Sequence, residues 1–332
     1  MTPIVSIIIP CYNEETTITK LLQAIKNQTF PIGEMEVIIA DGFSNDLTRE
    51  RINEFKLHFP ELAIKLIDNP QKNIPSALNT AIDHSEGEFI IRLDAHSVPS
   101  SDYVMLCIDN LKANIADNVG GVWKIMPGGE RMIAKAISLA AAHPLGVGDA
   151  LYRYASQPAF VDTVPFGAFR RTLVEKIGKY DETLLTNEDY EFNVRVRRSG
   201  GKVYLDPKIH SIYFARKNLI ELARQYWRYG FWKYKMLRRY PETIKWRQAL
   251  PPVFVLSLMI LFIGGIIYPP IFMLFGLELL IYLLVLLLGA VKVIREQKNW
   301  KLLFGIPTAI ATMHLFWGSG FLWSMVNSFL RK

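Results

Sequence analysis

Residues 89–97 read FIIRLDAHS, an apolar run followed by an acid and an imidazole two positions apart. A short apolar run of this kind is typical of a buried strand, which would place Asp94 and His96 at its tip. A carboxylate and an imidazole at the mouth of a sheet can hold a divalent cation. The same residues could equally form a turn with a polar edge, so the surrounding sequence has to be considered.

Strand-like and helix-like patterns alternate over the first 125 residues. The run Val5 to Ile9 is apolar except for Ser6, as expected of a parallel strand that is buried on both faces. Similar runs occupy residues 36–40, 63–67 and 89–93, and helical spacing of apolar residues marks the segments between them, 16–28, 46–59 and 74–85. The pattern predicts an α/β domain with a parallel or mixed sheet covered by helices.

Polar side chains follow three of these runs. Tyr12 and Glu14 come after the first run, Asp41 after the second, and Asp94 with His96 after the fourth. In open α/β sheets, ligands bind outside the carboxyl ends of the strands, so we expect these residues to converge on one edge. A nicotinamide-binding domain would need a glycine-rich turn after the first strand, and the sequence PCYNEE at residues 10–15 contains no glycine.

The chain changes character at residue 251, after which long apolar stretches dominate. Three of them, at about residues 252–268, 271–291 and 302–328, are long enough to cross a bilayer. The loop between the second and third carries Lys292, Arg295, Lys298 and Lys301, which places it on the cytoplasmic side. The third stretch either crosses once, leaving Arg331 and Lys332 outside, or follows a re-entrant path that keeps them inside.

The first 250 residues are expected in the cytoplasm. The N-terminus lacks the basic region of a signal peptide, and the two cysteines are too few for a disulfide scaffold. The net charge of +7 suits an anionic membrane surface, and no nucleic-acid-binding motif is present.

Residues 218–250 form an amphipathic region before the apolar stretches. On a helical wheel, Arg224, Arg228, Lys235 and Arg239 fall on one side, because each residue advances the helix by about 100°. Leu222 and Tyr226 are among the residues opposite them. The pattern predicts a helix that lies in the membrane interface.

Five motifs occur in order along the chain: SIIIPCYNEE, ADGFSND, NIPSALNTA, RLDAHS and NEDYEF. Together they resemble glycosyltransferase family 2, whose members have the nucleotide-sugar-binding GT-A fold. The stretches DTVPFGAFRR and RQYWRYGFWK are similar to the bacterial succinoglycan-type exopolysaccharide glucosyltransferases of this family. The resemblance covers about residues 4–245. It implies a GT-A domain over residues 1–217, an interfacial helix region over 218–250 and a transmembrane region over 251–332.

The resemblance implies a binding site for a nucleotide sugar, with a UDP-sugar expected. Its donor-binding residues would be Pro10, Tyr12, Glu14, Asp41, Asn79 and Asp94. Family members usually hold Mn²⁺ or Mg²⁺ through two aspartates, and here Asp94 and His96 occupy those positions, so the chain departs from the pattern at the second. His96 could instead contact a phosphate directly.

The resemblance also implies that Asp189 is the general base. With one base and no carboxylate nucleophile, the sugar would be transferred in a single displacement with inversion. Acceptor or diphosphate contacts are expected from Asp162, Gly167, Arg170 and Glu188, and from Gln225, Arg228 and Tyr229. The last three resemble the Gln-x-x-Arg-Trp signature of membrane polysaccharide synthases, with Tyr229 in place of the tryptophan. The alternatives are structural: the segment with Asp162, Gly167 and Arg170 could be a plain turn, and the helix with Gln225, Arg228 and Tyr229 could only anchor the chain at the membrane interface.

The expected acceptor is a saccharide on polyprenyl diphosphate, used in extracellular polysaccharide or glycan assembly alongside other enzymes of such a pathway. Two alternatives stay open at this point. The enzyme could transfer sugar to bare polyprenyl phosphate, or the chain could be a catalytically silent nucleotide-binding partner in the membrane.

Overall fold

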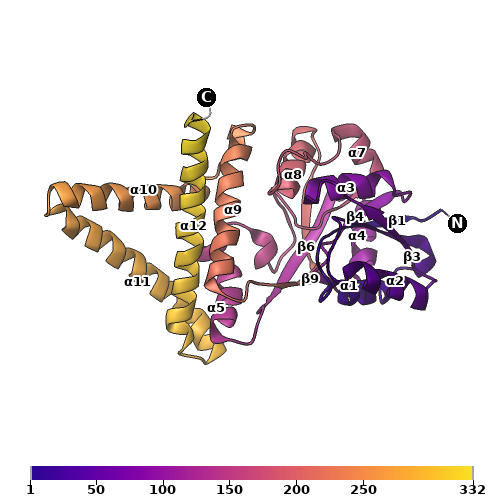
Figure 1. Cartoon of the computed structure of the whole chain (residues 1–332), viewed down its shortest axis with the longest axis horizontal. Coiled ribbons are helices and arrows are strands. Elements are labelled where there is room, and N and C mark those ends of the chain that lie inside the picture. Colours follow the sequence, from indigo (N-terminus) through magenta and orange to yellow (C-terminus); the bar gives the residue numbers. More distant parts are fainter. Residues whose placement is uncertain (1, 331–332) are drawn as a thin grey trace. The chain divides into compact units, whose positions relative to one another are not determined.

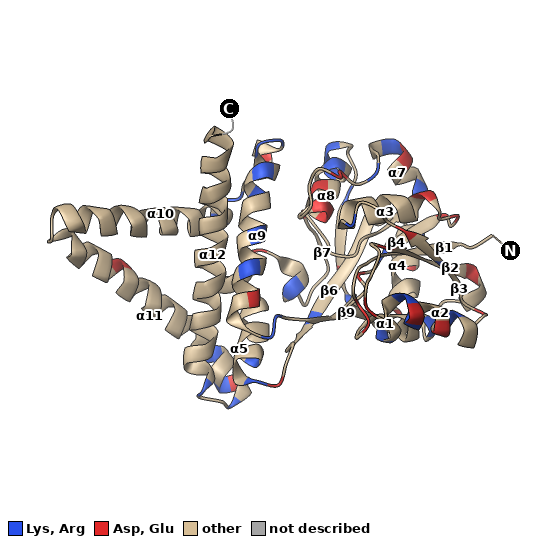
Figure 2. Ribbon diagram, viewed as in Figure 1, with Lys and Arg blue, Asp and Glu red and all other residues tan. Residues whose placement is uncertain are grey.

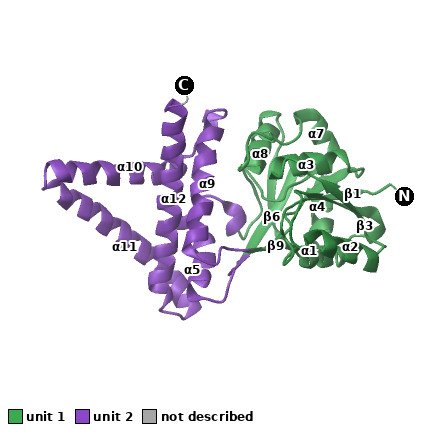
Figure 3. Ribbon diagram, in the orientation of Figure 1, with its two compact units in different colours: residues 1–124, 154–213 green, residues 125–153, 214–332 purple. Residues whose placement is uncertain are grey.

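The structure is a computed structural model that describes residues 2–330. The chain divides into two compact units (Figure 3). Unit 1 comprises the described residues up to Lys124 together with Tyr154–Tyr213, and unit 2 comprises Ile125–Arg153 and the described residues from Phe214 onward.

Unit 1 is built on a mixed sheet (Figure 1), which contains nine strands within the described residues and runs in the order β3-β2-β1-β4-β8-β6-β9-β5, with β7 paired to β9. The strands are β1 (Val5–Cys11), β2 (Met35–Asp41), β3 (Ala63–Asp68), β4 (Phe89–Arg92), β5 (Val98–Pro99), β6 (Asn118–Met126), β7 (Ala159–Phe160), β8 (Ala168–Arg170) and β9 (Val203–Phe214). Strands β1 to β4 pair in parallel, and β8 pairs antiparallel with β4. The predicted mixed α/β sheet is confirmed.

Helices cover this sheet because their apolar residues fall on one side. They are α1 (Ile18–Lys26), α2 (Thr48–His58), α3 (Ile74–Asp83), α4 (Tyr103–Lys112), α7 (Arg171–Ile177) and α8 (Glu188–Arg198), with the short 3₁₀ helix η1 (Ile32–Glu34). Helix α3 begins where Asn73 Oδ1 accepts a hydrogen bond of 2.9 Å from the Ser76 amide, with Pro75 in its first turn, a combination that stabilises a helix start. Ile7, Ile9, Val37 and Ile39 are fully buried in the core.

Unit 2 is helical. It contains α5 (Met132–Ala141), α6 (Pro144–Val147), α9 (Leu219–Leu237), α10 (Trp246–Ile267), α11 (Ile271–Gln297) and α12 (Leu302–Leu330), with the 3₁₀ helices η2 (Leu151–Arg153) and η3 (Pro241–Thr243). Within the described residues, α10, α11 and α12 are each long and apolar enough to cross a membrane. Arg331 and Lys332, whose side of the membrane the sequence left open, lie outside the described residues.

The two compact units are not the three regions expected from the sequence, whose boundaries stay a prediction. Residues 125–153, expected in the GT-A domain, belong to unit 2 because helix α5 packs on α12. The expected interfacial region over 218–250 contains α9, which ends at Leu237, and the beginning of α10, which starts at Trp246.

Candidate active site

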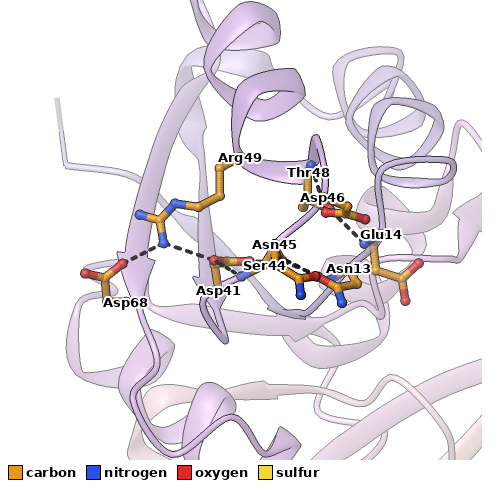
Figure 4. Close-up of polar contacts among 9 residues, drawn as sticks. All are labelled: Asn13, Glu14, Asp41, Ser44, Asn45, Asp46, Thr48, Arg49 and Asp68. Atoms are coloured by element: carbon orange, nitrogen blue, oxygen red, sulfur yellow. Dashed lines mark hydrogen bonds and ion pairs between the residues drawn. The ribbon is translucent and has the colours of Figure 1, made fainter.

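The loop after β2 is organised around Asp41, a side chain with no exposed surface (Figure 4). Its carboxylate accepts hydrogen bonds from the Ser44 amide at 3.0 Å and the Ser44 hydroxyl at 2.5 Å. Arg49 Nη1 donates to Asp41 at 3.0 Å and to Asp68 at 2.8 Å. A carboxylate has about four lone-pair sites, so three of these are used to hold the loop. The predicted contact of Asp41 with a nucleotide base stays a prediction.

The loop after β1 is joined to the loop after β2 through Asn13 (Figure 4). The Asn13 amide donates to the Ser44 hydroxyl at 2.8 Å, and Asn13 Oδ1 accepts from the Asn45 amide at 3.0 Å. Asn13 has a φ of 54°, a left-handed conformation that asparagine tolerates better than most residues. The two loops therefore form one hydrogen-bonded unit at the carboxyl ends of β1 and β2.

Glu14 connects this loop unit to the end of β4. Its amide donates to Thr48 Oγ1 at 2.8 Å, and its Oε1 lies 3.1 Å from His96 Nδ1. Tyr12 is 48% exposed beside Gly42, where a β-carbon would approach the Tyr12 ring to 3.2 Å. Pro10 lies within β1. The structure thus brings Tyr12, Glu14 and His96 to the same edge of the sheet.

A second cluster is centred on Arg92, the last residue of β4. Arg92 is 4% exposed, and its Nε and Nη2 donate to Asp94 Oδ1 at 3.2 and 3.1 Å. The same Nη2 donates to Glu188 Oε1 at 2.9 Å. Charge-assisted bonds of this geometry are among the stronger ones in proteins. Arg92 therefore joins the end of β4 to the first residue of α8, from a position 96 residues earlier in the chain.

Asp189 follows Glu188 in the first turn of α8. Burial raises the pKa of Asp189 to about 6, the negative charge of Glu188 adds to this increase, and the Arg92 guanidinium opposes it. Such a carboxyl is mostly ionised at neutral pH and is basic enough to accept a proton from a hydroxyl. Asp162 lies close by, because the hydroxyl of Tyr190 donates to Asp162 Oδ2 at 3.0 Å.

The structure does not bring every predicted residue to this cluster. Arg170 pairs in register with Phe89, at the beginning of β4, and donates to Glu88 at 2.6 Å. It therefore lies at the opposite end of β4 from Asp94, and this geometry does not support an acceptor contact. The reason is that β8 runs antiparallel to β4, which the sequence did not indicate.

Two further predicted residues are occupied by contacts within unit 1. Asn79 is buried, donates to the Tyr180 carbonyl at 2.9 Å and accepts from the Tyr180 amide at 2.9 Å. A β-carbon at Gly167 would lie 2.4 Å from Asn118 Oδ1, so this glycine allows a side chain, Asn118, to approach the backbone. These contacts favour structural roles for Asn79 and Gly167.

Gln225, Arg228 and Tyr229 lie on α9 and belong to unit 2. Gln225 Nε2 donates to the Tyr229 hydroxyl at 2.8 Å, and Arg216 Nε donates to Gln225 Oε1 at 3.3 Å. Arg228 is exposed. The motif therefore forms a local hydrogen-bonded unit with an accessible guanidinium.

Asp94 and His96 suit a divalent cation that is shared with a substrate. Within residues 2–330, no three His, Cys, Asp or Glu side chains are grouped to hold a metal ion. The Asp94 and His96 side chains are 19% and 39% exposed, so a cation can reach both. Mg²⁺ and Mn²⁺ commonly bind through one or two protein ligands, with water and substrate phosphates completing the shell. The donor set fits such an ion.

The sequence alone did not identify Arg92, Ser44 or the aromatic residues beside His96. Trp123 stacks on Tyr213 with ring centroids 4.3 Å apart, and the Tyr213 ring centroid lies 6.4 Å from that of His96. One sequence feature could have identified Arg92, its position at the end of an apolar strand, directly before the Leu-Asp-Ala-His stretch. A charged side chain buried in such a strand needs a buried partner of opposite charge.

Comparison with known proteins agrees with this geometry. The family model described as glycosyl transferase family 2 matches residues 6–178, slightly more than half of the chain. The chain belongs to glycosyl transferase family 2. The predicted family and fold class are confirmed, as is the assignment of the chain as a glycosyltransferase.

Two relatives are similar to this chain over most of its length. A dolichyl N-acetyl-α-D-glucosaminyl phosphate 3-β-D-2,3-diacetamido-2,3-dideoxy-β-D-glucuronosyltransferase of Methanococcus voltae is 27% identical over 97% of each chain. The succinoglycan biosynthesis protein ExoA of Rhizobium meliloti is 29% identical over 74% of this chain and 73% of its own length.

A solved structure of similar fold is that of the mannosyltransferase PcManGT from Pyrobaculum calidifontis, in complex with GDP-Man and Mn²⁺. It aligns with a TM-score of 0.66 over 97% of this chain and 88% of its own, at 17% identity. At this identity the likeness establishes the fold, and the site has to be argued from its own residues.

Proposed function

We propose that this glycosyltransferase moves a sugar from a nucleoside diphosphate to a lipid-linked saccharide, with inversion at the anomeric carbon. The observation that carries the proposal is the Arg92 cluster. Its guanidinium donates hydrogen bonds to both Asp94 and Glu188. Asp94 lies at the sheet edge where a donor would bind, and Glu188 is next to Asp189. The buried Arg92 thus connects the residue proposed to bind the donor, Asp94, with the neighbour of the residue proposed to remove the proton, Asp189.

In the proposed reaction, Asp189 accepts the proton of the acceptor hydroxyl. The hydroxyl oxygen forms a bond to the anomeric carbon as the bond from that carbon to the diphosphate oxygen breaks, and the nucleoside diphosphate leaves with the electron pair. A single displacement of this type inverts the anomeric configuration. The pKa of Asp189, about 6, lies close enough to neutral pH for efficient proton transfer.

Asp94 and His96 would hold Mn²⁺ or Mg²⁺, which when bound would neutralise charge on the diphosphate. Glu14 would orient His96, because its Oε1 lies 3.1 Å from the imidazole Nδ1. Tyr12, which is half-exposed, offers a ring against which a base can stack, and Asp41 would anchor the loop on which that pocket rests. PcManGT was solved with a nucleotide sugar and Mn²⁺ together, which supports this combination.

The acceptor is proposed to carry a sugar already. The name of the Methanococcus voltae relative, which matches nearly the full length of this chain, specifies a dolichyl phosphate that bears N-acetylglucosamine. This favours a saccharide on a polyprenyl phosphate or diphosphate over bare lipid phosphate. We also propose that the catalytic unit faces the cytoplasm, where nucleotide sugars are available, and that it works with other enzymes of a glycan assembly pathway.

The test is release of nucleoside diphosphate by the purified full chain in nanodiscs. UDP-, GDP- and dTDP-sugars would be offered with either a lipid-linked saccharide or bare polyprenyl phosphate. We expect release from one donor with the saccharide acceptor, reduced by about 10²–10⁴-fold in Asp189→Asn, and a product of inverted configuration by NMR.

Asp83→Asn is the control, because Asp83 is an exposed carboxylate on α3 that pairs with Lys179. It should retain wild-type turnover. Undiminished turnover in Asp189→Asn, or a product with retained configuration, would contradict the proposed base. Turnover with bare polyprenyl phosphate alone would instead contradict the proposed acceptor.

A further inference from the structure

The three apolar helices of unit 2 are packed very differently. In Figure 1, α10 and α11 each contact α12 near one end and extend away from it to the turn that joins them at residues 268–270, whereas α9 lies alongside α12. Most residues of α10 and α11 are exposed, while a larger share of α12 is buried within the protein. Helix α10 lies across α12 in Figure 1. The two helices therefore cannot both run along the membrane normal.

One side of α12 is covered by protein along its length, because the buried residues Leu302, Ile306, Met313 and Gly320 fall on the same side of the helix. Near its beginning, a β-carbon at Gly305 would lie 2.7 Å from the β-carbon of Ala136 on α5. Near its middle, His314 Nε2 lies 2.8 Å from the Leu145 carbonyl oxygen in α6. Helices α5 and α6 therefore both contact the first half of α12, on different sides of it.

The second half of the same face is occupied by α9, at close range. A β-carbon at Gly320 would lie 2.2 Å from the Trp227 carbonyl oxygen, and one at Gly230 would lie 2.0 Å from the Trp317 carbonyl oxygen. Reciprocal glycines allow two helix backbones to approach this closely. The depth of α12 in a membrane is consequently fixed by the depth of α9.

Helix α9 is too charged to enter the hydrocarbon. Figure 2 shows Lys and Arg residues spread along it, whereas α10 and α12 are almost uncharged. Arg224 and Arg228, separated by one turn, are exposed. If α12 crossed the bilayer with α9 packed on it, these guanidinium groups would be placed in lipid, where charged side chains are costly and rare.

The opposite face of α12 is exposed along the helix and, apart from Thr308, carries large apolar side chains. Phe304 is 76% exposed, Leu315 36%, Val326 44% and Phe329 68%. A helix with protein on one face and large apolar side chains on the other suits the plane of the interface, with the apolar face directed into the acyl chains.

We propose that only the α10–α11 hairpin enters the bilayer, and that α12 lies in the interfacial plane beside α9 and α5. Lipid acyl chains would cover the exposed apolar face of α12, and both of its ends would remain on the same side of the membrane. The proposal differs from both paths that the sequence left open for the third apolar stretch, a single crossing and a re-entrant path, and it does not depend on the identity of the substrates.

Depth measurements test it directly. Nitroxide labels would be placed at Phe304→Cys, Leu315→Cys and Val326→Cys in the full chain in liposomes, with Leu284→Cys on α11 as a deep reference. Residues 304 and 326 are about 33 Å apart along a helix, roughly the hydrocarbon thickness. We expect the three α12 labels to share one shallow depth by oxygen and nickel accessibility.

A crossing helix would instead place the label at 315 deepest and those at 304 and 326 near opposite surfaces, which would overturn the proposal. Labels shielded from both oxygen and nickel would show protein, such as a second copy of the chain, in place of lipid, and would also overturn it. The unsubstituted chain is the background control, because Cys11 and Cys107 are both buried.

Sidedness provides an independent measurement. Trp300→Cys and Leu330→Cys, at positions 72% and 78% exposed, flank and end α12. A membrane-impermeant maleimide should label both from the same side in sealed vesicles. Labelling from opposite sides would show that α12 crosses and would reject the proposal.

Discussion

Replacing Arg92 by methionine is the perturbation that should reveal most about the active site. The change removes a buried guanidinium that donates to Asp94 and Glu188 at 2.9–3.2 Å. Both carboxylates then lose the positive charge that Arg92 supplies. Breaking one partner of a buried ion pair costs about 3–5 kcal/mol. For a domain of this size, each kcal/mol lowers the melting temperature by about 2–4 °C, so we expect a decrease of about 6–20 °C.

Lys179→Met is the control, because Lys179 also pairs with a carboxylate, that of Asp83, but both side chains are exposed, at 41% and 54%. Exposed pairs are worth about 1 kcal/mol or less, so its melting temperature should fall by at most about 4 °C. Differential scanning fluorimetry of the detergent-solubilised chain measures both. Equal melting temperatures for the two variants would refute the inference that the Arg92 cluster is a buried charge network.

The same variant should alter the pH dependence of catalysis. Arg92 opposes the increase in the pKa of Asp189, so its removal should move the acidic limb of the kcat profile to higher pH. Combining Arg92→Met with Glu188→Gln removes one of the two unpaired charges and should recover part of the lost stability, as a double-mutant cycle would show. An unmoved acidic limb would mean that Arg92 acts on packing alone.

Three other outcomes are expected. With the pKa of Asp189 at about 6, the ionised fraction and hence kcat should fall about tenfold between pH 7 and pH 5, and a flat profile over this range would exclude Asp189 as the base. EDTA should abolish nucleoside diphosphate release and Mn²⁺ or Mg²⁺ should restore it, whereas activity that survives EDTA would remove the metal role of Asp94. Gly230→Leu, which places side-chain atoms against the Trp317 carbonyl, should destabilise unit 2 by about 1–3 kcal/mol or more. Gly276→Leu is the control and should not destabilise it, because nothing lies within 4 Å of a β-carbon there. Equal melting temperatures for the two variants would argue against close packing of α9 on α12.

Much of the fold follows from local sequence patterns. The apolar runs at residues 5–9 and 36–40 predict strands buried on both faces, and they form the parallel pair β1 and β2. The polar residues after these strands were expected at one sheet edge because strand polarity fixes where each carboxyl end lies. Asn13 and Asp41 do lie in one hydrogen-bonded loop unit through Ser44.

The remaining features depend on contacts between distant residues, which periodicity does not encode. Arg92 reads as part of a strand until its partner Glu188 is known, 96 residues later. Arg170 was expected near the acceptor, and only the antiparallel pairing of β8 with β4 shows that it lies at the other end of the strand. Local patterns therefore predicted the elements better than they predicted the pairing between them.

The placement of residues 125–153 in unit 2 has a practical consequence for producing the catalytic part in soluble form. Stopping the chain after residue 217 would remove α12 and leave the buried face of α5, including Ala136 and Ile137, without its covering helix. Such a fragment would display an apolar surface and would be prone to aggregate. A soluble enzyme would need two cuts, with Lys124 rejoined to Tyr154 by a short linker and the chain ended near Tyr213.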